Sequence, residues 1–233
     1  MFSKIYSSAT IGIDAYIVEV ETHSEKQIPN FLIVGLPDSA IKESRERVTA
    51  AIKNSGFQFP LKKITVNLAP ADIKKEGSAF DLPIAIGILN SAEMLNTDFL
   101  ETTVMLGELS LDGTLRKIKG ALSITVEAKE KGFKQIILPK ESAKEASIVE
   151  GIDVYGLENL SEVIEFLNGK DKLTIKLFWR LFKSVSSVIV PGVIIRTTSR
   201  SNGPLCPRFF ASSGLSICSH TAIFKPEAIN FIK

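Results

Sequence analysis

The sequence predicts a mixed α/β (α+β) domain over residues 1–169, followed by a tail of different composition over residues 170–233. Two observations predict this fold class. Strand-like and helix-like patterns alternate along the chain as far as residue 169, and a clear β-hairpin signal lies among them. A composition of 45% hydrophobic and 23% charged residues is typical of a globular protein with enough apolar mass for a core.

The first predicted strands differ in their pattern. Residues 15–22 (AYIVEVET) alternate apolar and polar side chains, as a half-buried strand does, whereas residues 31–37 (FLIVGLP) form the continuous apolar run of a buried strand. Apolar residues at helical spacing predict a helix over 38–56, with Asp38 as its N-cap and Gly56 at its C-terminal stop.

The segment around residue 80 predicts a strand that leads to a buried helix. Residues 62–70 (KKITVNLAP) are rich in β-formers and end at a proline. Residues 80–95 predict a helix with Pro83 in its first turn, where proline is tolerated. Asp81 opens this helix, and we expect its carboxylate to cap free N–H groups there.

The rest of the domain repeats these patterns. An Asp-Gly pair at 112–113 predicts a hairpin centred within residues 104–118. The remaining predicted elements are helices over 120–133, 141–151 and 159–169, and strands over 135–139 and 153–157.

A charge asymmetry separates the tail from the domain. Residues 171–233 contain nine Lys or Arg and two acidic residues, whereas residues 1–170 contain 19 basic and 24 acidic residues. The tail could be a basic disordered arm, a second small domain, or coding sequence read out of frame. Scarce acids together with abundant Ser, Arg and Cys favour the last, and the apolar runs argue against a solvated arm.

Targeting and metal-binding signals are weak. The N-terminus MFSKIYSSATIG lacks the apolar region of a signal peptide, and the apolar stretch 184–195 is too short to span a bilayer. We therefore expect a cytoplasmic protein without membrane contact. Cys206 and Cys218 lack zinc-site spacing, and the first 170 residues hold no cysteine and a single histidine, so no metal site is expected.

Four stretches within residues 31–89 form a specific signature: VGLPD, KESRERV, NLAPAD and EGSAFDLPIA. With them, residues 2–168 closely resemble the N-terminal domain of the ComM/YifB family, often labelled magnesium-chelatase-like AAA+ ATPases. The resemblance implies a ribosomal protein S5 domain 2-like fold, as in the proteolytic domain of Lon. It also implies a following AAA+ motor with ATP and Mg, a hexameric homo-oligomer, and a role in DNA processing as a branch-migration motor during transformation.

The chain departs from this family pattern after the domain. An AAA+ motor needs a G-x-x-x-x-G-K-[ST] loop to hold the nucleotide phosphates, and no stretch of the sequence has this form. No AAA+ module follows residue 170. The resemblance therefore does not carry ATPase activity to this chain, and we expect no cofactor in it.

The resemblance to Lon also bears on catalysis. In Lon-like peptidases a serine at the mouth of a helix is activated by a lysine from the helix after the hairpin. Aligning EGSAFDLPIA and GELSLDGTLRKIKG with that pattern places the serine position at Ala79 and the lysine position at Ile124. The sequence thus predicts no catalytic residues.

Ser78 is the alternative nucleophile, one residue earlier. An offset of one residue in a helix turns a side chain by roughly 100°, and neither Lys119 nor Lys129 stands at the matching base position. We interpret Ser78 as a local cap or turn residue. A Lon-like Ser-Lys peptidase with a shifted dyad remains the alternative function.

Four lysines flank the strand predicted over 62–70: Lys62, Lys63, Lys74 and Lys75. If they converge, they form a surface for sequence-independent contact with nucleic-acid phosphates. Acidic residues such as Asp72 and Glu76 lie among them, however, as on an ordinary solvated face. A third hypothesis is a small DNA-binding protein that uses its basic tail.

Overall fold

The computed structural model describes residues 1–95, 97, 99–169, 209–210 and 216–217. The chain divides into two units, Met1–Arg180 and Leu181–Lys233. In the second unit β10 (Phe209–Phe210) pairs antiparallel with β11 (Ser216–Ile217). The remainder of the predicted tail lies outside the described residues, so its boundary at residue 170 and its origin stay predictions.

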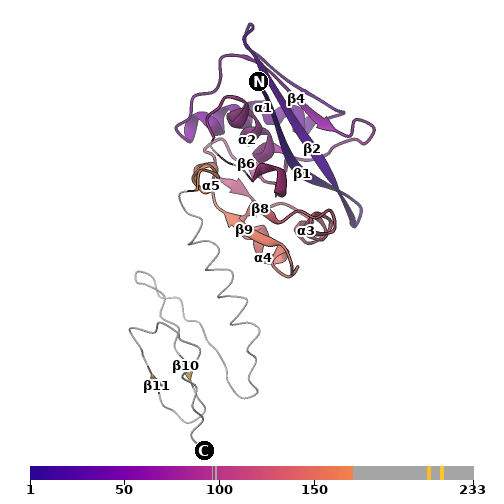
Figure 1. Cartoon of the computed structure of the whole chain (residues 1–233), viewed down its shortest axis with the longest axis vertical. Helices are drawn as coiled ribbons and strands as arrows, with labels where there is room; N and C mark the ends of the chain where they lie inside the picture. The colour runs from indigo at the N-terminus through magenta and orange to yellow at the C-terminus, as the bar shows by residue number, and fades with distance from the viewer. Residues whose placement is uncertain (96, 98, 170–208, 211–215, 218–233) are drawn as a thin grey trace, which may run out of the picture. The chain divides into compact units, whose positions relative to one another are not determined.

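A seven-stranded sheet organises the first unit, in the order β3-β4-β2-β1-β5-β8-β9. Figure 1 labels five of its strands, β4, β2, β1, β8 and β9. β1 pairs antiparallel with β2, and β2 pairs antiparallel with β4, whereas the other neighbouring pairs are parallel. The strands are β1 (Phe2–Ile11), β2 (Asp14–Glu25), β3 (Asn30–Val34), β4 (Lys63–Ala69), β5 (Thr103–Met105), β8 (Gln135–Pro139) and β9 (Asp153–Leu157).

Helices and a short hairpin complete the described part of this unit. The hairpin pairs β6 (Glu108–Leu109) with β7 (Leu115–Arg116). The α-helices are α1 (Ser39–Asn54), α2 (Asp81–Ser91), α3 (Ala121–Glu130), α4 (Lys140–Ala146) and α5 (Leu160–Leu167), and a 3-10 turn, η1, spans Leu100–Thr102. Within the described residues, no helix is both long and apolar enough to cross a membrane.

The sheet carries hydrophobic cores on both faces because alternate strand residues point to opposite sides. Ile137 of β8 belongs to one core, which it shares with residues of α1, α2 and α5. Its neighbours Ile136 and Leu138 belong to the other core, with residues of α3 and α4. The predicted mixed α/β fold is confirmed.

Most predicted elements are present, with shifted ends. The hairpin is confirmed, but its strands are only two residues long, and residues 103–105 instead form the parallel strand β5 of the main sheet. The helix predicted over 141–151 is shorter and ends at Ala146. Asp38 is the N-cap of α1, as predicted, and accepts a hydrogen bond from Ile41 N at 2.8 Å.

The prediction of a buried strand at 31–37 is wrong in its burial. β3 has a neighbour on one side only, β4, and so forms an edge of the sheet. Phe31 and Ile33 pack against the core, but Leu32 and Val34 on the other face are exposed. A continuous apolar run does not distinguish a central strand from such an edge.

Candidate functional site

The candidate site is the loop that connects β4 to α2, residues 70–80, because it carries the EGSAF sequence. Backbone hydrogen bonds tie the loop to the segment before α1: Asp38 N donates to Lys75 O at 3.1 Å, and Lys75 N donates to Leu36 O at 3.3 Å. The Asp38 carboxylate also accepts a hydrogen bond from Gly77 N at 3.1 Å. One acidic side chain therefore both caps α1 and holds the loop in place.

The Ser78 hydroxyl donates a hydrogen bond to the Glu108 carboxylate of β6. Glu108 also accepts a hydrogen bond from Arg116 Nη1 at 3.4 Å. Lys119 and Lys129, the lysines considered as bases, are exposed. The sequence predicts a local cap or turn residue at Ser78: its carbonyl accepts a hydrogen bond from Asp81 N at 3.2 Å, as in a turn, and its hydroxyl joins the loop to the hairpin through the Glu108 carboxylate.

A helical offset does not separate Ser78 from Ala79, because α2 begins only at Asp81. Ser78 and Ala79 differ in what they contact: the Ser78 hydroxyl binds the hairpin, whereas the Ala79 side chain packs against a hydrophobic core. Ala79 packs against the hydrophobic core that lies under α3, and its carbonyl accepts a hydrogen bond from Gly107 N at 2.9 Å.

The two positions aligned with the peptidase dyad are both associated with the same hydrophobic core. Ile124 of α3 is 2% exposed and belongs to the cluster against which Ala79 packs. A methyl group and a butyl group therefore occupy a shared apolar environment. Neither side chain can act as a nucleophile or a base.

Asp81 forms a buried ion pair with Arg47 of α1. Arg47 Nε donates to Asp81 Oδ2 at 2.8 Å, and Arg47 Nη2 donates to Oδ1 at 3.1 Å. Leu109 N also donates to Oδ2, at 3.2 Å. The prediction that Asp81 caps α2 is wrong, because its oxygens are used by α1 and the hairpin, and α2 has no side-chain cap.

Burial sets the protonation of this carboxyl. Its side chain is 1% exposed, and desolvation raises the pKa of Asp81 to about 6 against the opposing effect of Arg47. The neighbouring Asp81 carboxylate in turn raises the pKa of the Arg47 guanidinium. The pair joins three elements at the mouth of α2, and its geometry is that of a structural clamp.

The four predicted phosphate-contacting lysines do not form one cluster. Lys62 directly precedes β4 and Lys63 is its first residue, whereas Lys74 and Lys75 follow the strand, so a strand roughly 20 Å long separates the pairs. Lys63 pairs with Glu25 at 2.8 Å, and Lys74 pairs with Glu76 at 2.8 Å.

Lys75 is fully buried, and its ammonium donates to the carbonyl of Ile73 at 2.6 Å. Desolvation lowers the pKa of Lys75. Its place in the predicted phosphate-binding set therefore has to be corrected, because a buried ammonium offers no contact at the surface. Contact of nucleic acid with Lys62, Lys63 and Lys74 stays a prediction.

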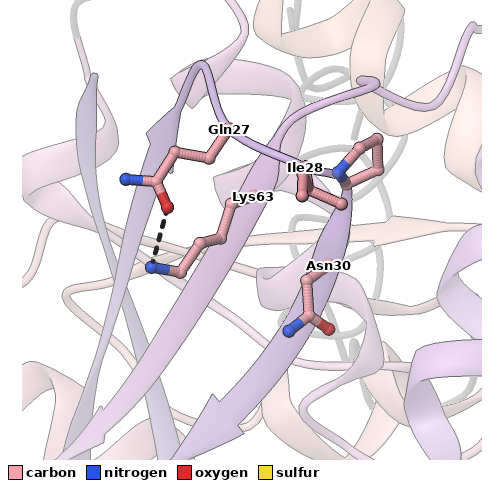
Figure 2. A pocket seen from close by; sticks show the side chains of 5 residues that line it. Gln27, Ile28, Asn30 and Lys63 are labelled. Carbon is pink, nitrogen blue, oxygen red and sulfur yellow. Dashed lines mark hydrogen bonds between the residues drawn. The ribbon is translucent and has the colours of Figure 1, made fainter.

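An open hollow lies where the chain enters β3 (Figure 2). Its volume is about 550 Å³, and its lining consists of Gln27, Ile28, Pro29, Asn30 and Lys63. Lys63 Nζ donates to Gln27 Oε1 at 3.2 Å across it. Among the described residues, no group of three His, Cys, Asp or Glu side chains could hold a metal ion.

Comparison with known proteins gives the family. The model of the family described as subunit ChlI of Mg-chelatase matches residues 20–142. The chain belongs to this family. The matched residues include the whole β4–α2 loop and Ile124, so the ChlI-family domain contains the candidate site.

Individual relatives agree with the predicted resemblance. The chain is 43% identical over 169 residues to competence protein ComM of Haemophilus influenzae, and the aligned segment covers 72% of this chain and 33% of ComM. It is 43% identical over 171 residues to uncharacterized protein YifB of Escherichia coli, covering 73% of this chain and 34% of YifB. The similarity to these relatives thus extends over about a third of their length.

A more distant match supports the Lon-like fold. The chain is 26% identical over 164 residues to archaeal Lon protease of Thermococcus kodakarensis, covering 68% of this chain and 25% of that protein. The resemblance to ComM/YifB and the Lon-like character of the ChlI-family domain are therefore confirmed.

Proposed function

We propose that residues 1–169 are the non-catalytic N-terminal domain of a magnesium-chelatase-like AAA+ ATPase of ComM/YifB type, with a role in DNA processing. The observation that carries the non-catalytic part is that Ile124 belongs to a hydrophobic core against which Ala79 packs. The positions of a Lon-like dyad hold hydrocarbon, so the domain contributes a folded surface rather than a reactive centre.

The contacts of Ser78 argue against the alternative of a shifted Ser-Lys peptidase. A serine nucleophile needs a base that accepts its proton, and in Lon-like enzymes this base is a neutral lysine amine. Ser78 instead donates to Glu108, which is also bound by Arg116. A carboxylate that also accepts a hydrogen bond from an arginine is not the neutral amine on which Lon-like enzymes rely, so it does not replace the lysine.

Hydrolysis of fluorescently labelled casein tests this proposal. We expect the wild-type chain and the Ser78→Ala variant to release label at the same background rate. Ser110→Ala serves as the matched control, because Ser110 also bonds a charged side chain of the hairpin, at 2.6 Å from Arg116 Nε. Turnover that Ser78→Ala abolishes and Ser110→Ala preserves would reject the proposal in favour of a peptidase.

The DNA-processing part draws support from the similarity to competence protein ComM. Because electrostatic contact with phosphates weakens steeply with salt, fluorescence anisotropy with a labelled oligonucleotide at several salt concentrations is the appropriate measurement. We expect Lys62→Glu/Lys74→Glu to weaken binding, whereas Lys131→Glu, at the C-cap of α3, leaves it unchanged. Equal affinity for all three proteins would remove these lysines from the DNA-contacting surface.

The same titration separates the third hypothesis, a DNA-binding protein that relies on its basic tail. That hypothesis predicts that deletion of residues 171–233 abolishes the salt-dependent affinity. Affinity that survives the deletion rejects it and assigns DNA binding to the domain.

A further inference from the structure

The first part of the β4–α2 loop, residues 70–77, is anchored by a charged side chain. Lys75 is the one residue of this segment that is buried, and its neighbours Lys74 and Glu76 are exposed. Lysine is among the residues that are least often fully buried. An apolar anchor would favour the closed loop by leaving water, whereas an ammonium group loses its hydration there.

Little in the described structure compensates the buried ammonium of Lys75. Its Nζ donates to the Ile73 carbonyl at 2.6 Å, which belongs to the same segment, so this bond does not fasten the segment to the rest of the domain. No ion pair among the described residues includes Lys75, and Asp72 attracts the ammonium only from beyond ion-pair distance. Because an ammonium has three N–H donors, a single carbonyl replaces its lost hydration poorly. Desolvation accordingly lowers the pKa of Lys75.

The contacts that hold residues 70–77 against the domain are few and polar. Two backbone hydrogen bonds join Lys75 to Leu36 and Asp38, at 3.3 and 3.1 Å, and the Asp38 carboxylate accepts from Gly77 N at 3.1 Å. The Tyr16 hydroxyl adds a long contact of 3.5 Å to the carbonyl that precedes Lys75. No residue of the segment belongs to either hydrophobic core. Opening the segment therefore leaves both cores intact.

Both ends of the segment are fixed, which confines any motion to residues 70–77. On one side β4 ends at Ala69, which pairs with β2. On the other side the Ala79 carbonyl accepts a hydrogen bond from Gly107 N at 2.9 Å. Gly77 lies just before this fixed point, with a φ of 91° and open space where a Cβ would be, so the chain can change direction there.

We propose that residues 70–77 form a strap that opens and closes while the rest of the domain stays folded, and that the buried ammonium of Lys75 sets how often the strap is open. Closing removes the ammonium from water and opening returns it, so the charge opposes closure. The strap is thus a segment of low local stability within a stable domain. Opening also brings the Lys75 ammonium to the surface beside Lys74, so the number of exposed charges at the candidate site depends on the state of the strap.

Hydrogen exchange of backbone amides in the full chain, measured by NMR, tests the proposal. The amides of Asp38 and Gly77 donate hydrogen bonds between the strap and the domain, and the amide of Val20, in the centre of the sheet, reports global unfolding. After correction for intrinsic rates, we expect Asp38 and Gly77 to exchange at least about 100-fold faster than Val20. Low urea should accelerate Val20 and hardly affect the other two amides, because opening the strap exposes little surface. Equal protection of all three amides would overturn the proposal.

Lys75→Met tests the role of the charge, because methionine has a similar length and no ammonium. We expect this variant to raise the protection of the Asp38 and Gly77 amides at least about tenfold. Lys74→Met is the matched control, since Lys74 is exposed and pairs with Glu76 at 2.8 Å, and it should leave their protection within about twofold of wild type. Unchanged protection in Lys75→Met, or an equal gain in both variants, would contradict control by the buried ammonium.

Amine labelling of the wild-type chain measures the same opening at the side chain. Brief acetylation with an N-hydroxysuccinimide ester, followed by tandem mass spectrometry, distinguishes the amines of Lys74 and Lys75. We expect Lys75 to be acetylated in the folded chain, but at least about tenfold more slowly than Lys74, because it reacts only when the strap is open. Labelling of Lys75 as fast as Lys74 would show that the closed strap does not shield the amine. Labelling only at the rate of Val20 exchange would show that no local opening occurs, and either result rejects the strap.

Discussion

Arg47 and Asp81 form a two-pronged ion pair that joins α1 to the start of α2, although 34 residues separate them in the sequence. The contacts are 2.8 and 3.1 Å long, and the carboxylate is almost completely shielded from water. Glu108 lies near the same pair, on the hairpin, and Leu109 N donates a further hydrogen bond to the Asp81 carboxylate. The clamp therefore fixes the entrance of the helix behind the candidate site.

The first prediction concerns the pH dependence of Asp81. Its folded pKa of about 6 lies above the ordinary value of 3.8, so the folded state binds this proton more tightly than the unfolded state. The contribution to stability is thus fully favourable below about pH 4 and is lost as pH rises through 6. Across this window we expect the loss to be about 3 kcal/mol.

Urea unfolding of wild type and Asp81→Asn at pH 7.5 and pH 4.5 measures the contribution of Asp81 to the free energy of unfolding. The difference between the unfolding free energies of the two proteins isolates Asp81, because the other carboxyls titrate in both proteins and cancel. Relative to Asp81→Asn, wild type should gain stability as pH falls. A difference that is constant, or that moves the other way, would show that the carboxyl titrates normally.

Arg47→Met should destabilise the domain at pH 7.5 by about 3–5 kcal/mol, because it leaves a buried carboxylate without its partner. Without the guanidinium, the pKa of Asp81 should rise further, so most of this loss should be recovered at pH 5. Arg45→Met, on an exposed neighbouring position of α1, is the control. Similar small losses for both variants would mean that the ion pair does not clamp the helices.

Asp38→Ala should cost about 2 kcal/mol, since it removes both the cap of α1 and the bond to Gly77 N. Asp38→Asn keeps one oxygen acceptor and should lose about half as much. Thermal unfolding at neutral pH compares the three proteins. If Asp38→Asn is as stable as the wild type, the second bond to the loop contributes nothing.

Gly35→Ala and Gly12→Ala test a close backbone approach at the end of β3. Both glycines have a positive φ, so alanine is strained at either position by about 1 kcal/mol. At Gly35 a Cβ would also lie 2.2 Å from the carbonyl oxygen of Leu68, whereas at Gly12 nothing lies within 4 Å. We expect Gly35→Ala to lower the unfolding midpoint much more in a chemical denaturation experiment, and equal losses would argue against this packing.

Much of the fold could be predicted from local patterns, because most strands and helices carry a clear period. β1 shows where this approach fails. Its buried positions include Ser3, Ser7 and Ser8, which pack tightly but do not give the apolar alternation of a strand. The exposure of β3 was likewise unpredictable, since the order of strands in the sheet depends on contacts distant in the sequence.

The candidate site, like the fold, was only partly predictable from the sequence. The hydrocarbon at Ala79 and Ile124 follows from alignment with a known pattern, but the partners of Ser78 and Asp81 do not. Glu108 is 30 residues from Ser78 in the sequence, and no local signal links them. The sequence predicts a surface charge at Lys75 because lysines are rarely buried, and its burial depends on the packing of the loop against Leu36 and Asp38.

The most direct test of the unreactive site is acylation of Ser78 by p-nitrophenyl acetate, followed by intact-mass and peptide mass measurement after hydroxylamine treatment. Working serine nucleophiles accumulate an acyl-enzyme in a burst, and the resulting ester is cleaved by hydroxylamine. We predict no burst and no acyl ester at Ser78 in the wild-type chain. A stoichiometric, hydroxylamine-sensitive ester at this residue, absent from Ser78→Ala, would contradict a non-catalytic domain.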